Sequence, residues 1–204
     1  MSHATPATPA TDSSTTTGAP PARATTWTID AAHTDILFAA KHMMVTTVRG
    51  TFREVEGTLT LDEADPTSSS AIIRIAIGSL DTASQPRDAH LRSADFFDAE
   101  HHPWMDFRST AIEHVGGNDY RITGDLTIRG TTRPITFDAT FLGFYTGLKG
   151  NRRVGIAART TMNRKAWGLD WNVALEAGGW LVGEEIRIDV EVAADLAAAA
   201  DVAA

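Results

Sequence analysis

The polar segment from Arg87 to Arg92 has the residue types and the spacing that could support chemistry. Arg87, Asp88, His90 and Arg92 place two cations, a carboxylate and an imidazole close together, and general acid–base catalysis uses such groups. The same side chains could instead form a structural network that ties a helical insertion to a turn at Asp81-Thr82, and we favour this second interpretation. The sequence shows no Gly-rich phosphate loop that opens a helix and no serine in a nucleophile-elbow context.

The histidines form the second group of candidates. His42 shares an otherwise apolar strand face with Ile36 and Phe38, where it could donate a hydrogen bond to a ligand carbonyl or bond a backbone carbonyl as a core histidine. His101 and His102 are neighbours in a loop before a proline, and such neighbours rarely converge on one ion. The absence of cysteine excludes thiolate nucleophiles, disulfides and cysteine-based metal sites. We expect no metal, no cofactor and no catalytic residue.

Composition limits the partners of this chain. The 204 residues suit one domain, and a formal net charge of −8 argues against nucleic acid, which requires clustered Lys and Arg. No stretch approaches the roughly 20 apolar residues of a membrane helix. Residues 1–26 are mostly Ala, Thr, Pro and Ser without the apolar run of a signal peptide. They predict a disordered tail and a cytoplasmic protein. The composition leaves the oligomeric state open, with a homodimer as one alternative.

From Trp27 onward the dominant hydrophobic period is two, which is typical of strands with one wet face. The alternation is clearest over five segments, and three more strands are expected between them. Closing about eight antiparallel strands into a barrel avoids long exposed edges. We therefore predict an all-β fold, a closed eight-stranded antiparallel barrel, with strands within residues 34–42, 49–61, 71–80, 104–114, 120–129, 135–141, 154–163 and 186–192.

One segment, residues 84–103, breaks this period. Pro86 can open a helical turn and Pro103 ends it, so we expect a short helical insertion that caps or flanks the barrel. Leu91, Phe96 and Phe97 should pack inward from it. The chain is Ala-rich from Ala193 onward, and this end is expected to be frayed or weakly helical. We assign residues 195–204 to a separate tail.

The polarity of the alternation indicates an apolar lumen. The opposite strand faces carry Arg74, Arg121, Asp125 and Arg187, among others, which argues against a lipid-facing outer wall. An eight-stranded barrel is either filled by its own side chains or just wide enough for one small ligand. Small residues occur on the predicted inner faces, and periodicity alone leaves both alternatives open; these residues are Ala40, Gly50, Gly57, Gly124, Ala139 and Ala158.

The ordered segments of residues 27–193 resemble the YceI-like family of lipocalin-like polyisoprenoid-binding proteins. Two long blocks carry most of the resemblance, and shorter matches precede, separate and follow them. The resemblance implies a barrel with a hydrophobic pore for a long isoprenoid chain, such as a polyprenyl or quinone-type lipid, and no established reaction. The two blocks are Arg-Asp-Ala-His-Leu-Arg-Ser-Ala-Asp-Phe-Phe from Arg87 and Gly-Asp-Leu-Thr-Ile-Arg-Gly-Thr-Thr-Arg-Pro from Gly124.

Three hypotheses follow for this chain. The first is a module that binds and sequesters or transports such a lipid in its lumen, within residues 27–194. The second is an enzyme that acts on the lipid with His42 or the Arg87–Arg92 cluster, and the third is a structural barrel with a filled core. For the first, the predicted ligand-binding residues are Ile36, Phe38, Ala40, His42, Phe52, Ile75, Phe107, Leu126, Phe137, Phe141, Ile156 and Met162.

Overall fold

The computed structural model describes residues 24–148, 150–176 and 178–198. Within these ranges strands dominate and a single α-helix, α1, spans Gln85–Arg92. The prediction of an all-β fold with a short helical insertion is therefore confirmed. Most of both predicted tails lies outside the described residues. No helix in the described part of the chain is long and apolar enough to cross a membrane.

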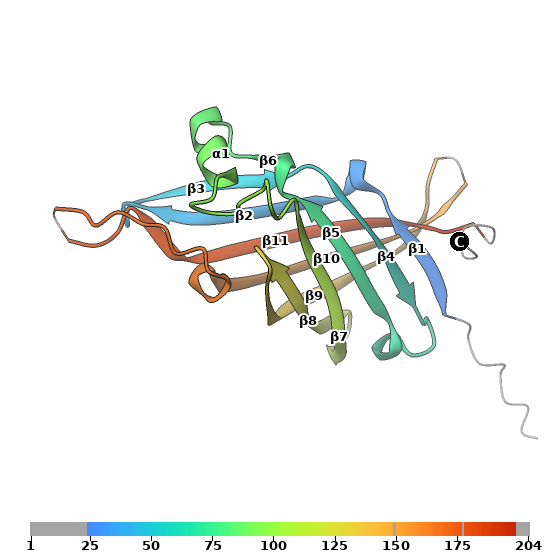
Figure 1. The fold of residues 1–204 in the computed structure, drawn as a ribbon. Coiled ribbons are helices and arrows are strands. Elements are labelled where there is room, and N and C mark those ends of the chain that lie inside the picture. The colour runs from blue at the N-terminus through green and yellow to red at the C-terminus, as the bar shows by residue number, and fades with distance from the viewer. Residues whose placement is uncertain (1–23, 149, 177, 199–204) are drawn as a thin grey trace, which may run out of the picture.

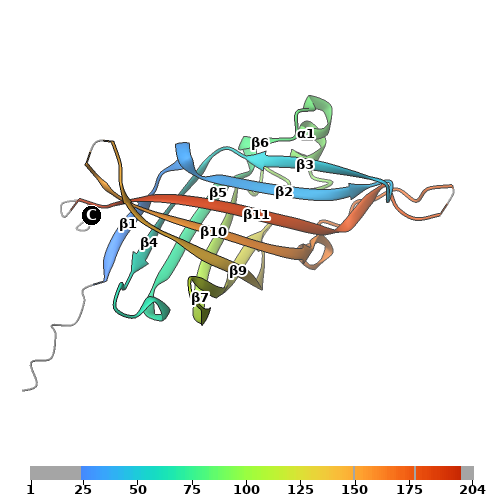
Figure 2. The same cartoon turned by 180° about the vertical axis from the view of Figure 1, so that it is seen from behind.

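The strands form an elongated barrel (Figures 1 and 2). Short 3-10 turns at Ala31–His33, Pro66–Ser68, Ile77–Ser79 and Arg164–Trp167 interrupt or join them. The strands are β1 (Thr25–Ile29), β2 (Asp35–His42), β3 (Thr46–Phe52), β4 (Val55–Leu61), β5 (Ser70–Ala76), β6 (Leu80–Asp81), β7 (Trp104–Gly116), β8 (Asp119–Ile128), β9 (Thr131–Thr146), β10 (Arg152–Asn163) and β11 (Val182–Leu196).

Eight of these strands close the barrel. The antiparallel order β1-β4-β5-β7-β8-β9-β10-β11 returns to its start, because β1 also pairs with β11. In that closing pair Trp27 lies opposite Leu196 and Ile29 lies opposite Ala194. The predicted closed eight-stranded antiparallel barrel is confirmed.

The barrel wall is irregular along one side, where three long strands are broken. One edge of β11 pairs with β2 over Ile186–Glu191 and with β1 over Ala194–Leu196, so β1 and β2 are two parts of one interrupted strand. In the same way, β4 pairs with β1 while β3 pairs with β2. At the next position, β5 pairs with β4 while β6 pairs with β3. The sheet order ends at β6, whereas β5 continues to β7. The wall therefore has a seam beside β6.

Helix α1 lies at the β3–β6 side of this seam (Figure 1), and a buried carboxylate fixes it there. The Asp88 side chain, 6% exposed, accepts hydrogen bonds from the Thr82 backbone N–H at 2.9 Å and from the Thr82 hydroxyl at 2.5 Å. Arg87 donates to the Thr82 hydroxyl and carbonyl oxygens, both at 2.7 Å, and Arg92 donates to the Leu80 carbonyl. These bonds form the structural network that the sequence suggested.

The predicted strand faces are largely in place, with one difference at the C-terminal end. The Gly-Gly-Asn-Asp turn joins β7 to β8 as a hairpin. Residues 193–196, expected to begin the frayed Ala-rich end, instead continue β11. Ala193 and Ala194 are 6% and 0% exposed, and Ala194 pairs with both β1 and β10 and belongs to the buried cluster around Trp27.

A cluster of ionic contacts holds the two ends of the barrel wall together where β1, β10 and β11 meet. Arg153 on β10 donates to both carboxylate oxygens of Asp195 on β11 and also to Asp30, next to β1. Burial raises the pKa of Asp30, but hydrogen bonds from His33 and Ala32 and the nearby positive charges outweigh it, so the net pKa is lowered. The hydrogen bond and the charge of Arg153 lower the pKa of Asp195.

These lowered pKa values predict how stability depends on pH. A carboxyl group with a depressed folded-state pKa stabilises the fold above its unfolded pKa and loses this effect as pH falls through the folded value. Thermal unfolding should therefore show a steep loss of stability below about pH 4, and Asp195→Asn should flatten that loss and lower Tm by several degrees at pH 7. Asp138→Asn, which changes an exposed carboxylate on β9, is the control. Equal acid profiles for the two variants would contradict the assignment.

Candidate functional site

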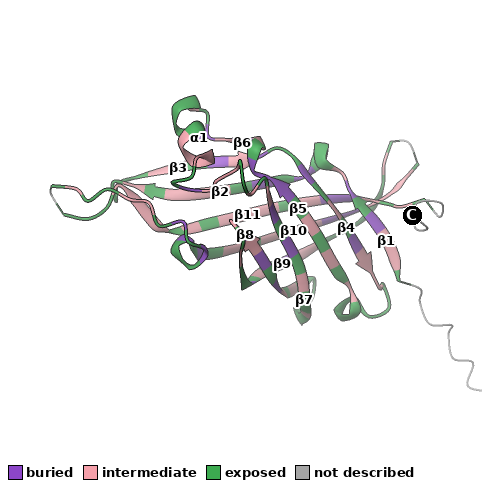
Figure 3. Ribbon diagram, in the orientation of Figure 1, coloured by how far each residue is buried: buried purple, intermediate pink, exposed green. Residues whose placement is uncertain are grey.

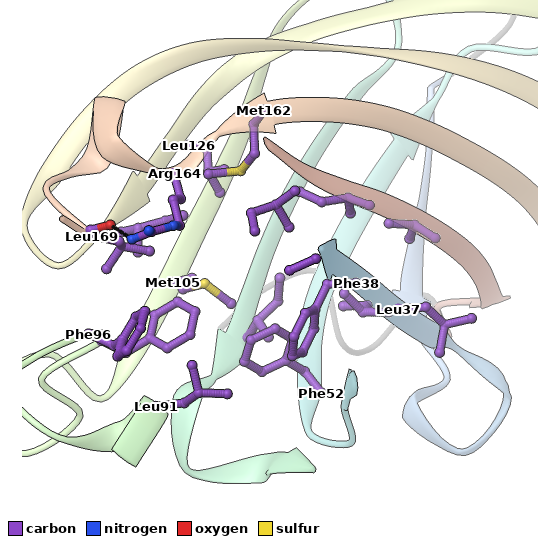
Figure 4. Close-up of a pocket in the computed structure, with 18 of the residues that line it drawn as sticks. Leu37, Phe38, Phe52, Leu91, Phe96, Met105, Leu126, Met162, Arg164 and Leu169 are labelled. Carbon is purple, nitrogen blue, oxygen red and sulfur yellow. Dashed lines mark hydrogen bonds between the residues drawn. The ribbon is translucent and has the colours of Figure 1, made fainter. Parts of the chain in front are cut away.

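The barrel encloses a cavity of about 510 Å³, within the range of small-molecule sites. Figure 4 shows its wall near the seam, where Phe38, Phe52, Leu91, Phe96 and Met105 surround the open space. These side chains come from β2, β3, α1, the segment after α1 and β7. The periodicity left open whether the lumen is filled, and the structure shows that it is hollow.

Eleven of the twelve predicted ligand-binding residues line this cavity. They face it from seven strands, as the period-two pattern requires. Whether they contact a ligand remains a prediction. The eleven are Ile36, Phe38, Ala40, His42, Phe52, Ile75, Phe107, Leu126, Phe137, Ile156 and Met162.

Phe141, the twelfth, lies outside the cavity. Its strand neighbour Ile156 lines the cavity's inner end, but Phe141 packs on a separate cluster that contains the fully buried Trp27 and Val154. Its ring centroid is 5.1 Å from that of Phe144. Phe141 is in phase with the lumen, but the lumen is already plugged at this level by the Trp27 cluster, which also includes Leu59 and Ala194.

Successive inward residues of β11 show the extent of the cavity. Val182, Ile186, Ile188, Val190 and Val192 all line it, and the next inward residue, Ala194, belongs to the Trp27 cluster. At about 3.3 Å per residue, Val182 and Val192 are about 30 Å apart along the strand. The cavity is therefore a narrow tube closed at the Trp27 end.

Two glycines keep aromatic rings against the wall of this tube. A Cβ on Gly50 would lie 2.3 Å from the ring of Phe38, and one on Gly124 would lie 2.5 Å from the ring of Phe107. Both distances are below van der Waals contact, so only glycine allows each ring to lie over the neighbouring strand. Since the rings cover the wall instead of crossing the lumen, the space between them stays open.

The polar side chains of the cavity lining are all basic or imidazole groups. They are Lys41 and His42 from β2, Arg87 and His90 from α1, and Arg164. No Asp or Glu belongs to the lining among the described residues, although the whole chain carries a net charge of −8. The lining can therefore donate hydrogen bonds to an electron-rich headgroup, but it offers no carboxylate to act as an acid or base.

His42 lies at the end of β2 opposite Val182, at the end of the tube away from the Trp27 cluster. It is half-buried, and no protein group in residues 24–148, 150–176 and 178–198 hydrogen-bonds its ring. The ordinary role of a core histidine bonded to a backbone carbonyl is thus not what the structure shows. Its imidazole is available to a ligand group at the mouth.

Arg164 differs from His42 because the protein already satisfies it. The side chain is 2% exposed and donates to the carbonyl oxygens of Leu169, Gly183 and, at 3.4 Å, Val182. Burial lowers the pKa of its guanidinium, against the raising effect of Glu184 and Asp170. Arg164 thereby ties the segment after β10 to the start of β11 and forms part of the wall.

Aromatic contacts cover the seam above the cavity. The ring of His90 on α1 lies 4.4 Å from that of Trp171 and 5.2 Å from that of Phe96, edge-on in both cases. The imidazole of His90 also contacts the carboxylate of Asp95 at 3.0 Å. The α1 region and the segment before β11 therefore meet across the opening that the broken strands leave.

Sequence reasoning missed several residues that line the cavity. Leu169, Trp171 and Leu181 lie in the irregular segment before β11 and line the tube, but no periodicity marks them. Ile122, Ile186, Ile188, Val190 and Val192 do alternate with polar residues, and that signal could have added them. Leu91, Phe96 and Phe97 face the cavity as expected.

The paired histidines occupy a loop away from the lumen. The imidazole of His101 lies 2.9 Å from the carboxylate of Asp98 and is 70% exposed. The hydrogen bond and charge of Asp98 raise the pKa of His101. His102 lies near Gly130 instead. Within the described part of the chain, no three His, Asp or Glu side chains come together as metal ligands.

Comparison with known sequences gives consistent matches over nearly the whole barrel. The model of the YceI-like domain matches residues 27–194. A UPF0312 protein of Staphylococcus epidermidis is 38% identical over 166 residues, which cover 81% of this chain and 94% of that protein. A UPF0312 protein of Staphylococcus aureus is 32% identical with the same coverage.

Solved structures give the same picture. BcnA of Burkholderia cenocepacia superposes with a TM-score of 0.68 at 25% identity, covering 81% of this chain and 98% of BcnA. The YCEI protein of Campylobacter jejuni gives 0.67 at 27% identity, covering 78% and 90% of the two chains. A polyisoprenoid binding domain from Saccharophagus degradans shares the fold, with a TM-score of 0.61 at 13% identity over 84% and 98% of the chains.

Proposed function

Because this chain belongs to the YceI-like domain family, we propose that its barrel binds one long isoprenoid lipid and sequesters or transports it unchanged. The observation that carries the proposal is the apolar tube of about 510 Å³, closed at one end and lined by side chains from most of the strands. The Saccharophagus degradans neighbour, described as a polyisoprenoid binding domain, supports the same class of ligand.

The wall suits a branched hydrocarbon chain. Isoleucine, phenylalanine and methionine side chains supply apolar area without directional bonds, and each buried CH₂ contributes about 0.8 kcal/mol. Specificity must then come from the few polar groups near the mouth. We propose that His42 donates a hydrogen bond to an oxygen of the headgroup, which favours a quinone-type or polyprenyl lipid over a plain hydrocarbon.

The proposal includes no catalysis. The cavity lining contains His42 and His90 but no carboxylate within the described residues. His42 has no carboxylate partner there, and the partner of His90, Asp95, is an exposed residue outside the lining, so the tube holds no acid–base pair. In the second candidate cluster, Asp88 is bonded to Thr82 and Arg92 to Leu80. These groups are engaged in holding α1.

Analysis of bound lipid tests the proposal. Native mass spectrometry of the purified protein should show one apolar adduct, and solvent extraction should release an isoprenoid lipid. Protein stripped of lipid in detergent should bind a quinone with a long side chain more tightly than the matched hydrocarbon, and His42→Leu should remove that difference while retaining chain binding. A protein without adduct that also fails to take up either compound would overturn the proposal. Size-exclusion chromatography and cell fractionation would test a homodimer and a cytoplasmic location.

A further inference from the structure

An exposed apolar tip adjoins the end of the tube opposite the Trp27 cluster. It consists of Met43, Met44 and Val45 in the β2–β3 turn and Val173 and Trp180 in the segment before β11. Their exposed fractions are 49%, 64%, 77%, 46% and 47%. Figure 3 shows this end largely in the colour of exposed residues, and in Figure 1 the segment before β11 projects beyond the β2–β3 turn.

The two parts of the tip form one surface. The Met43 backbone N–H donates to the Leu181 carbonyl at 2.8 Å, and Gly179 lies against the side chain of Met44. Each part continues directly into the cavity lining: His42 precedes the turn, and Leu181 and Val182 follow Trp180. The apolar tip and the apolar tube are therefore continuous.

The backbone of the β2–β3 turn indicates that the methionines serve a purpose other than folding. Met43 and Met44 have φ angles of 49° and 61°, and the Val45 N–H bonds the His42 carbonyl at 3.1 Å. Positive φ at both central residues is the type I′ arrangement, for which Asn-Gly is the preferred sequence. Bulky side chains at such angles are outliers that concentrate at functional sites.

The chemistry of the tip identifies its partner. Residues 43–47 carry no charge and residues 171–183 carry only Glu176, so the tip offers no basic patch for anionic headgroups. Trp180 lies 5.8 Å from the ammonium of Lys165, and a tryptophan beside a long cationic side chain is typical of the membrane–water boundary.

We propose that the tip inserts shallowly into the surface of a neutral lipid bilayer and places the mouth of the tube against it. This inference rests on the proposed function, because an isoprenoid lipid resides in the membrane and has to enter the protein without crossing water. The continuity of tip and tube gives the chain an apolar route from the bilayer to the Trp27 cluster.

Co-sedimentation with phosphatidylcholine vesicles tests the tip. The wild type should bind with an affinity that changes little between low and high salt, and Trp180 fluorescence should shift to the blue. Met43→Asn/Met44→Gly should weaken binding about tenfold or more, while its Tm stays equal or rises because Asn-Gly suits the turn. The matched control, Val115→Asn/Leu148→Asn, removes exposed apolar side chains elsewhere and should bind as the wild type does.

The same proteins separate this inference from the proposed function. The Met43→Asn/Met44→Gly variant should still take up lipid presented in detergent, but should take it up from vesicles about tenfold more slowly. Wild type that binds lipid in detergent yet does not bind vesicles would overturn the bilayer inference alone and leave the tip to a protein partner. Equal vesicle binding by the wild type and the methionine variant would also overturn it, as would an equal loss in the control.

Discussion

Replacing Ala40 by Phe should weaken lipid binding by about two orders of magnitude and leave the barrel folded. Ala40 faces the tube between Phe38 and His42, so a phenyl ring there would displace the ligand near its entrance. If the ring removes about 100 Å² of contact with the ligand, the loss is about 2.5 kcal/mol, or roughly 70-fold. The measurement is titration with a fluorescent polyprenyl or quinone analogue, accompanied by thermal unfolding.

The matched control is the same substitution one residue earlier. Ala39 lies between Arg49 and Arg187 on the neighbouring strands and is not among the residues that line the tube. Ala39→Phe should retain binding. The opposite pattern would support a filled structural barrel: a loss of about 1–3 kcal/mol in stability for Ala40→Phe, as overpacking causes, with no change in bound lipid.

Replacing Asp88 by Ala should destabilise the barrel by about 3 kcal/mol, because it leaves two donors of Thr82 without their charged acceptor in a buried site. For a chain of this size the corresponding fall in Tm is about 6–12 °C. Since Asp88 fixes α1 over the seam, the variant should also release bound lipid faster. Thermal unfolding and lipid dissociation rates measure the two effects.

Two controls separate the hydrogen bonds of Asp88 from its charge and from α1 in general. Asp88→Asn keeps one acceptor oxygen and should lose less stability than Asp88→Ala. Asp95→Ala removes the exposed carboxylate that contacts His90, and should change stability by no more than about 0.5 kcal/mol. If Asp88→Ala were as mild as Asp95→Ala, the network around Thr82 would not be what holds α1.

The sequence predicts the barrel well because burial of one strand face leaves a period of two that no other element imitates. Leu126 and Ile128, or Ile186 and Ile188, alternate with polar residues, and all four face the cavity. The same signal assigns most of the lining. The alternation cannot show whether the lumen is hollow. Gly50 and Gly124 leave room for the rings of Phe38 and Phe107 at the wall, and these contacts arise only when the strands pair.

Other features of the site depend on long-range pairing that local patterns do not encode. The seam exists because β11 pairs with β2 and β1 in turn, and nothing in the sequence of β6 marks it as the last strand of the sheet order. Phe141 alternates correctly, but the Trp27 cluster fills its level of the barrel. Trp171 and Leu181 reach the tube from an irregular segment, where periodicity carries no information.

The Trp27 cluster that closes the inner end has a consequence for ligand selection. Because one end of the tube is closed, the tube selects ligands by chain length. A chain that reaches Val192 while its headgroup is level with His42 fills the tube. Each further isoprene unit then pushes the headgroup outward. Shorter chains leave wall uncovered and longer ones lose the contact with His42, so affinity should peak at one chain length. A smaller side chain in the closed end, for example at Leu59, should lengthen the tube and move that peak to longer chains.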